Sequence, residues 1–172
     1  NSVRGQDHLL SEDVTVAEVL KGAGYATGFI GKWGIGLPGT EGAPDKQGFD
    51  FSYGYYDQAR AHGFFPHYLM RNGKPDPIPE NYGFNMNRLK TYNSRPVDRL
   101  EDVKNRYDEN GRLVPDGIPD ADAAKYSENL FQKEALRFIS ENNDNPFFLY
   151  YATQLPHGPC ITPDLGAYKD KP

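Results

Sequence analysis

The sequence predicts an α/β fold because it contains two units in which a helical pattern is followed at once by a short apolar strand. The units span about residues 14–31 and 120–153. Each strand runs into a polar loop that contains glycine and proline, and open α/β sheets bind ligands in the loops at the carboxyl ends of their strands. We therefore expect the two loops to meet and to form a ligand site.

The first unit opens with a helix that carries its own cap. Thr15 can cap the helix while Glu18, three residues on, reaches back to it, which is the reciprocal capping-box arrangement. The apolar residues expected to form one face of this helix are Val16, Val19, Leu20 and Ala23. Gly24 follows as a left-handed stop, and residues 25–30 are typical of a short buried strand that runs into Gly31.

The second unit is a longer helix followed by a strand. Asp120 or Asp122 can begin the helix, which continues to about Asn142. The apolar stripe expected on this helix consists of Tyr126, Leu130, Phe131, Ala135, Phe138 and Ile139. After a break at 142–146, residues 147–152 form a continuous apolar run, as expected of a strand covered on both faces.

Between the units, about residues 43–119 show no helical or strand period and are predicted to form a long irregular insertion. The many aromatic residues in it favour an ordered insertion on the substrate side. A turn is expected at 71–74, and residues 107–113 suggest a small hairpin with Asn-Gly at its tip.

Composition excludes several classes of protein. The net charge of −5 argues against a nucleic-acid or polybasic membrane surface. The mean hydropathy is −0.75, and no apolar run approaches the roughly 20 residues of a membrane-spanning helix. A single cysteine excludes an internal disulfide framework and a cysteine-cluster metal site. The chain opens at Asn1 without a signal-peptide pattern and ends on Pro172 in what looks like an interrupted loop, so we expect a piece of a longer protein.

Two loop residues are the strongest candidates for chemistry. Lys32 stands among glycines at a strand end, where its ammonium group can bind an anion, although a solvent-exposed lysine in a flexible turn fits the same pattern. The spacing of a phosphate-binding P-loop is absent. His157 lies between two prolines that stiffen its loop, so its imidazole can donate to an oxyanion or protonate a leaving group. A hydrogen bond to a neighbouring turn is the structural alternative for this histidine.

An aromatic stretch at 55–68 also contains arginine and histidine side chains. It can form a wall that binds a sugar or an aryl group, or it can pack the insertion onto the body of the domain, which the pattern favours. Asp57, His62 and His67 could imitate a metal site, but their spacing matches no firm ligand pattern. Cys160 has no obvious activating base and is expected to be an inert thiol.

Four blocks of the sequence together resemble the sulfatase family of the alkaline-phosphatase-like superfamily. Residues 15–33 are similar to the segment T-x-A-E-x-L-K-x-A-G-Y-x-T and the G-K-W-H-x-G that follows it. Residues 48–55 resemble the block G-F-D-x-F-x-G-Y, and residues 126–157 resemble the later helix, strand and P-H. Because the blocks stand in family order over roughly residues 10–160, we interpret 1–172 as an internal part of a sulfatase catalytic domain.

The resemblance implies part of a three-layer α/β sandwich around a large mixed, mostly parallel sheet. It also implies hydrolysis of sulfate esters by a formylglycine, formed from the cysteine or serine of C/S-x-P-x-R, beside a Ca²⁺ ion. Lys32 matches the lysine that binds the sulfate group, and His157 matches the histidine that contacts the sulfate and its bridging oxygen. We further expect His62, Arg60 and Trp33 to bind substrate, which would be a sulfated small molecule or a sulfated glycan. By the same resemblance, the protein would be periplasmic or extracellular.

The sequence also departs from the family pattern. Gly34 stands where the family has a histidine two places after the lysine, and His62 is our candidate to replace it. No C/S-x-P-x-R occurs, and the paired aspartates and the D-N-G metal ligands are missing. We therefore expect the nucleophile and the Ca²⁺ ligands to lie outside this segment, which would be inactive if isolated. The alternatives are a degenerate module that binds glycans without catalysis and a related phosphoester or phosphonate hydrolase.

Overall fold

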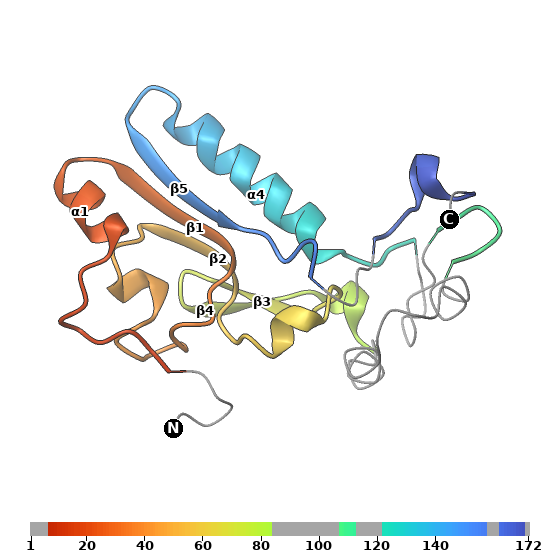
Figure 1. Ribbon diagram of the computed structural model, residues 1–172, viewed down its shortest axis with the longest axis horizontal. Helices are drawn as coiled ribbons and strands as arrows, with labels where there is room; N and C mark the ends of the chain where they lie inside the picture. Colours follow the sequence, from red (N-terminus) through yellow and green to blue (C-terminus); the bar gives the residue numbers. More distant parts are fainter. Residues whose placement is uncertain (1–6, 84–106, 113–121, 158–161, 171–172) are drawn as a thin grey trace.

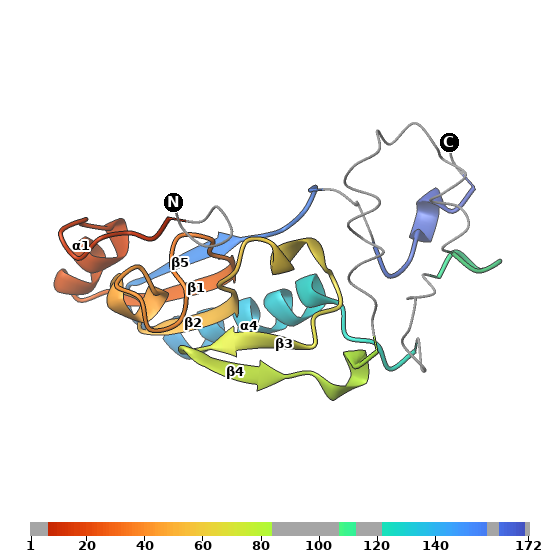
Figure 2. The same ribbon diagram turned by 90° about the horizontal axis from the view of Figure 1, so that it is seen from below.

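The computed structural model describes residues 7–83, 107–112, 122–157 and 162–170. The centre of the fold is a five-stranded sheet in the order β4-β3-β2-β1-β5 (Figure 1, Figure 2). The strands are β1 (Ala26–Lys32), β2 (Phe51–Tyr55), β3 (Tyr68–Arg71), β4 (Lys74–Pro77) and β5 (Phe147–Ala152). β1 pairs in parallel with both β2 and β5, whereas the pairs β2–β3 and β3–β4 are antiparallel. The predicted α/β class with a mixed sheet is therefore confirmed.

Two helices lie on opposite faces of this sheet. α4 (Ser127–Asn142) packs on the apolar cluster that contains Ile30 of β1, and α1 (Val16–Gly22) contributes Ala17 to a second cluster around Phe29. Because consecutive residues of a strand point to opposite faces, Phe29 and Ile30 belong to different apolar layers. The described 3-10 turns are η1 (Pro44–Lys46), η2 (Arg60–His62), η3 (Pro79–Asn81) and η4 (Gly166–Tyr168).

The first predicted unit forms with one correction. Thr15 Oγ1 accepts the backbone N–H of Glu18 at 3.2 Å, and the Glu18 carboxylate accepts the backbone N–H of Thr15 at 2.8 Å, so the capping box is confirmed. Gly24 follows with a φ of +89°. The predicted apolar face was wrong, because this short helix approaches the sheet through the small side chain of Ala17 and leaves Val16 58% exposed.

The second helix starts later than predicted. α4 begins at Ser127, whereas Asp122 lies in a turn and Asp120 lies outside the described residues. The backbone ahead of the helix already has other partners: the N–H of Lys125 donates to the side-chain oxygen of Asn81 at 2.8 Å, and the Asn81 amide donates back to the Lys125 carbonyl at 2.8 Å. Because these bonds fix the backbone of Lys125, the residues before Ser127 do not continue the helix.

β5 forms where the apolar run predicted it, but it is not covered on both faces. It lies at the edge of the sheet beside β1, and within the described part of the chain no strand pairs with its outer side. Tyr150 and Tyr151 are therefore 46% and 40% exposed. The expectation of full burial was wrong because it assumed a central strand.

Residues 43–119 were predicted to form an irregular insertion, but they contain three of the five strands, β2, β3 and β4. The prediction that this region lacks strands was therefore wrong. The turn predicted between β3 and β4 is confirmed: Asn72 and Gly73 have φ values of +47° and +77°, as a two-residue hairpin turn requires. Of the hairpin predicted at 107–113, the turn at its tip forms, because the N–H of Gly111 donates to the Asp108 carbonyl at 2.9 Å. Arg112 bridges to Asp164, and Leu113 lies outside the described residues.

An ion-pair network ties α4 to β3. Arg71 donates two hydrogen bonds to the Glu134 carboxylate, at 3.0 and 2.9 Å, and Arg137 donates a third at 3.0 Å. The Arg71 guanidinium also lies 4.3 Å from the centre of the Tyr53 ring. Burial alone would raise the pKa of Glu134, but the two arginines outweigh it and hold this pKa below its ordinary value.

Candidate active site at the carboxyl edge of the sheet

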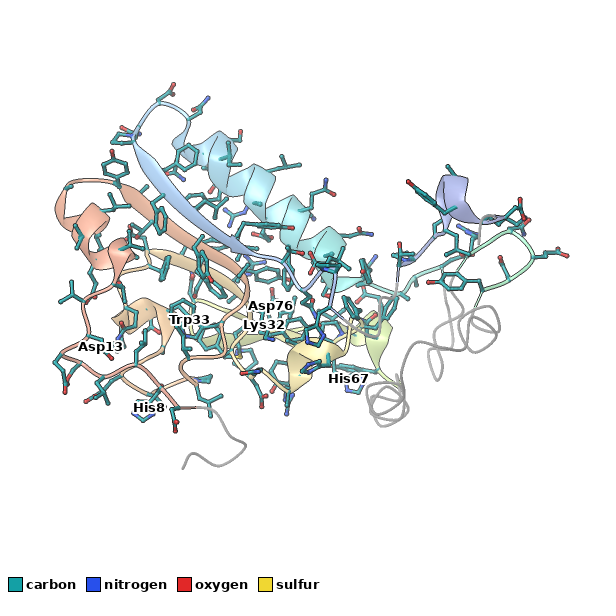
Figure 3. All side chains as sticks on the ribbon, viewed as in Figure 1. His8, Asp13, Lys32, Trp33, His67 and Asp76 are labelled. Atoms are coloured by element: carbon teal, nitrogen blue, oxygen red, sulfur yellow. The ribbon has the colours of Figure 1, made fainter. Side chains whose placement is uncertain are left out.

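The two predicted loops leave the sheet side by side. β1 and β5 are parallel neighbours, and Gly31 lies opposite Ala152, so Lys32 at the end of β1 is one residue past that pair. On its other side Lys32 pairs with Tyr55, the last residue of β2. The carboxyl ends of all three strands therefore meet at one edge, where Figure 3 labels Lys32. We call this region, with the loops that follow β1, β2 and β5, the sheet-edge site.

Glycine is required next to the lysine by the close approach of the strands. Gly31 has a φ of +119°, and a Cβ atom there would lie closer than 3.0 Å to the backbone carbonyl of Ala152. Gly54 of β2 faces the same crowding, because its Cβ would meet the backbone of Gly31. The lysine is thus held at the end of three tightly packed strands rather than in a flexible turn.

The structure brings His62 and His157 together. Their ring centres are 4.7 Å apart and their planes form an angle of 70°. His62 is half-buried in η2, where its Nδ1 lies 3.1 Å from the Ala59 carbonyl, a hydrogen bond that places the proton on Nδ1. His157 is exposed in the loop after β5. Lys32, at the end of β1, and His157, in the loop after β5, belong to the same edge of the sheet, and their joint binding of one anion stays a prediction.

A buried glutamine that the sequence did not single out connects the histidine segments. Gln154 is 4% exposed. Its side-chain oxygen accepts a hydrogen bond from Ser127 Oγ at 2.7 Å, and its side-chain nitrogen donates to the Ala61 carbonyl. Its backbone N–H donates to the Glu128 carboxylate at 2.7 Å. A glutamine just after an apolar strand was the only sequence signal for this role.

Arg60 lies at a cavity next to the sheet-edge site. Its guanidinium carbon is 4.8 Å from the centre of the Tyr68 ring, and both residues line an open cavity of about 120 Å³. Asp57 lines the cavity as well, but its carboxylate accepts the backbone N–H groups of Ala59 and Arg60 at 2.7 and 3.3 Å. These bonds give Asp57 a structural role at the start of η2.

Trp33 lies in the core rather than at the rim of the site (Figure 3). Its indole N–H donates to the Gly42 carbonyl at 2.7 Å, and its ring contacts Phe29 and Phe49 edge to face at 5.0 and 5.5 Å. With 9% of the residue exposed, the side chain offers little surface to a ligand. Its position favours packing over the expected contact with substrate.

The remaining candidates do not assemble into a metal site. In the described ranges, no three side chains of the types His, Cys, Asp and Glu are grouped so that they could hold an ion. His67 packs its ring on Tyr82 at 5.8 Å, and its buried Nε2 has no hydrogen-bond partner among the residues that the structure describes. Cys160 lies outside the described residues. A Cβ atom added at Gly34 would lie 3.7 Å from the side chain of Gln58.

No helix within the described residues is long and apolar enough to cross a membrane.

The sequence is similar to those of known sulfatases. A family model described as Sulfatase matches residues 2–171. The chain is 31% identical over 175 residues to an N-acetylgalactosamine-6-O-sulfatase of Bacteroides thetaiotaomicron, which covers 86% of this chain and 33% of that protein. It is 32% identical over 160 residues to arylsulfatase G of Homo sapiens, covering 90% of this chain and 27% of that protein. The chain thus spans a third or less of the length of these relatives.

Solved structures show the same fold. One, from work on a Bacteroides thetaiotaomicron locus for glycosaminoglycan metabolism, matches with a TM-score of 0.52 and 22% identity over 90% of this chain and 37% of that one. Another, Ps i-CgsB in complex with k-i-k-neocarrahexaose, matches with a TM-score of 0.50 and 22% identity over 90% of this chain and 29% of that one. With the family match over nearly the whole sequence, the chain belongs to the sulfatase family.

Proposed function

We propose that this chain is the part of a sulfuric ester hydrolase that supplies Lys32 and His157 to the sulfate group under attack. One observation supports the proposal: Lys32 ends β1 and His157 lies in the loop after β5, and these two strands are parallel neighbours with Gly31 opposite Ala152. A tetrahedral anion at this edge would therefore lie within the reach of both loops.

The two side chains suit the charges that develop when a sulfate ester is cleaved. The ammonium group of Lys32 would neutralise charge on the non-bridging oxygens, which is the kind of preorganised electrostatic contact that lowers a barrier most. The imidazole of His157 would protonate the alkoxide that leaves. In the family pattern, a formylglycine would supply the nucleophile beside a Ca²⁺ ion. The described residues provide no site for that ion, so we assign both to other parts of the full-length protein.

We favour a sulfated sugar as the substrate. The Bacteroides thetaiotaomicron relative is named as an N-acetylgalactosamine-6-O-sulfatase, and the Arg60–Tyr68 pair offers a cation and an aromatic face beside the sheet-edge site. The guanidinium, which lies over the Tyr68 ring, can bind hydroxyl or sulfate groups of a sugar. We place the full-length protein in the periplasm or outside the cell, and a signal peptide in its complete coding sequence would support that placement.

The test is the activity of the full-length protein with Lys32→Ala or His157→Ala. We expect each variant to lose at least about 10²-fold in kcat/KM on 4-nitrophenyl sulfate and on a 6-O-sulfated sugar. Lys133→Ala and His8→Ala, which alter an exposed lysine and an exposed histidine elsewhere, are the matched controls and should keep the wild-type rate. An unchanged kcat/KM in both site variants would contradict the assignment. Faster turnover of 4-nitrophenyl phosphate than of the sulfate would point to a phosphoester hydrolase.

A further inference from the structure

A buried glutamine links the three segments that meet behind the two histidines. Gln154 uses both ends of its side-chain amide, since the oxygen accepts from Ser127 at the start of α4 and the nitrogen donates to Ala61 in η2. Its backbone belongs to the loop that follows β5 and is fixed by Glu128 at 2.7 Å. Gln154 therefore joins α4, η2 and the β5 loop in one place.

These contacts fix the backbone on which each imidazole stands. Ala61, whose carbonyl accepts from the glutamine, is the residue directly before His62. On the other side, the backbone N–H of His157 donates to the Gln154 carbonyl at 2.9 Å. One residue thus holds the main chain beside both histidines, whose rings lie 4.7 Å apart.

The amide and its partners are shielded from water. Gln154 and Ser127 are 4% and 0% exposed, so water cannot replace a lost partner without a change in packing. A buried carbonyl or hydroxyl that loses its partner is strongly unfavourable. If the amide were removed, η2 and the β5 loop would shift to satisfy the Ala61 carbonyl. A shift of about 1 Å in a reacting group can lower a rate by about 10²-fold.

We propose that Gln154 is a positioning residue of the sulfatase site, which holds His62 and His157 as one imidazole pair with a fixed orientation toward the ester oxygen. This inference rests on the proposed function. It assigns His62 a role through its contact with His157, and it explains why a neutral, fully buried amide lies directly behind an exposed histidine.

The first experiment replaces the amide by a side chain of similar length that cannot form the two bonds. In the full-length protein, Gln154→Met should lower kcat on 4-nitrophenyl sulfate by about 10- to 100-fold with little change in KM. Ser127→Ala, which removes only one of the two bonds, should give a smaller loss of the same kind. Gln47→Met is the matched control, because Gln47 is another buried glutamine, at the end of η1, whose amide donates to a backbone carbonyl, that of Glu41 at 2.9 Å. It should lower the Tm but leave kcat unchanged.

A double-mutant cycle separates positioning from stability. In a His62→Ala background, Gln154→Met should change kcat by less than about threefold, because the pair that it holds is already gone. Its effect on the Tm should persist in that background. An equal loss of kcat in both backgrounds, or a Gln154→Met variant that loses stability but keeps its rate, would overturn the proposal.

A second readout does not depend on turnover. In full-length protein labelled with ¹³C only at histidine, we expect nuclear Overhauser effects between the His62 and His157 rings that disappear in Gln154→Met. If the wild-type protein cleaves no sulfate ester but this ring contact is lost in the variant, the proposed function fails and the positioning role stands. If the contact is the same in both proteins, the positioning role fails.

Discussion

Replacing Gly31 by alanine should damage both the fold and the sheet-edge site. The φ of +119° at Gly31 strains any residue with a side chain, by about 1–2 kcal/mol. The added Cβ would also lie closer than 3.0 Å to the Ala152 carbonyl, which is backbone and cannot rotate away. Overpacking adds about 1–3 kcal/mol, so we expect Gly31→Ala to lower the free energy of unfolding by about 2–5 kcal/mol.

Gly24→Ala separates the two contributions. Gly24 also has a positive φ, +89°, but nothing lies within 4 Å of the position of its Cβ. It should therefore show the backbone strain alone, about 1–2 kcal/mol. Urea denaturation of the two variants in the full-length protein gives the difference, which measures the clash with Ala152.

The same substitution should also affect catalysis, because Lys32 directly follows Gly31. If β1 moves away from β5 by about 1 Å to admit the methyl group, kcat/KM on 4-nitrophenyl sulfate should fall by up to about 10²-fold. Gly24→Ala should leave that value unchanged. The reasoning is refuted if Gly31→Ala unfolds at the same urea concentration as Gly24→Ala and retains full activity.

Three further predictions concern the packing around the site. Glu134→Gln should destabilise the protein at neutral pH by about 1–3 kcal/mol, since the partners of Arg71 are weakened. Because the pKa of Glu134 is lowered in the folded state, its stabilising effect is present above its ordinary pKa of 4.5 and is lost as the pH falls through the lower folded value. Urea denaturation from pH 7 to pH 3 should show the variant and wild type converging at the acid end, and a constant difference would contradict this. Trp33→Phe should lower stability by about 1–2 kcal/mol through the lost bond to Gly42 while KM stays within about twofold; a large rise in KM would show that the indole touches substrate. Thr15→Ala should lower stability by about 1 kcal/mol through loss of the helix cap, measured by thermal denaturation, with kcat unchanged.

Local signals explain what could be predicted from the sequence. The capping box at Thr15 and Glu18 and the hairpin turn at Asn72 and Gly73 each depend on a few adjacent residues, and all of them form as predicted. The strand at 147–152 is marked by its continuous apolar run. In each case the chemistry that decides the structure lies within the segment itself.

The parts that could not be predicted depend on partners far away in the chain. β2 alternates aromatic residues with serine and glycine over only five residues, Phe51–Tyr55, which is a weak signal for a strand. It becomes a strand because β1 and β3 bond to its two edges. The start of α4 is delayed by Asn81, which is 44 residues from Lys125. Gln154 was missed for the same reason, because its partners in α4 and η2 lie 27 and 93 residues away. Lys32 and His157 could be named as candidates from the sequence because they stand in motifs.

The position of β5 has a practical consequence for anyone who produces this segment by itself. Its outer row of peptide groups pairs with no strand in the described part of the chain, and two half-exposed tyrosines stand beside that row. Such an edge invites a strand of another molecule to dock on it. We expect the isolated polypeptide to aggregate at micromolar concentration. Fusion of a further strand after the β5 loop, or lysine in place of Tyr150, should restore a monodisperse sample.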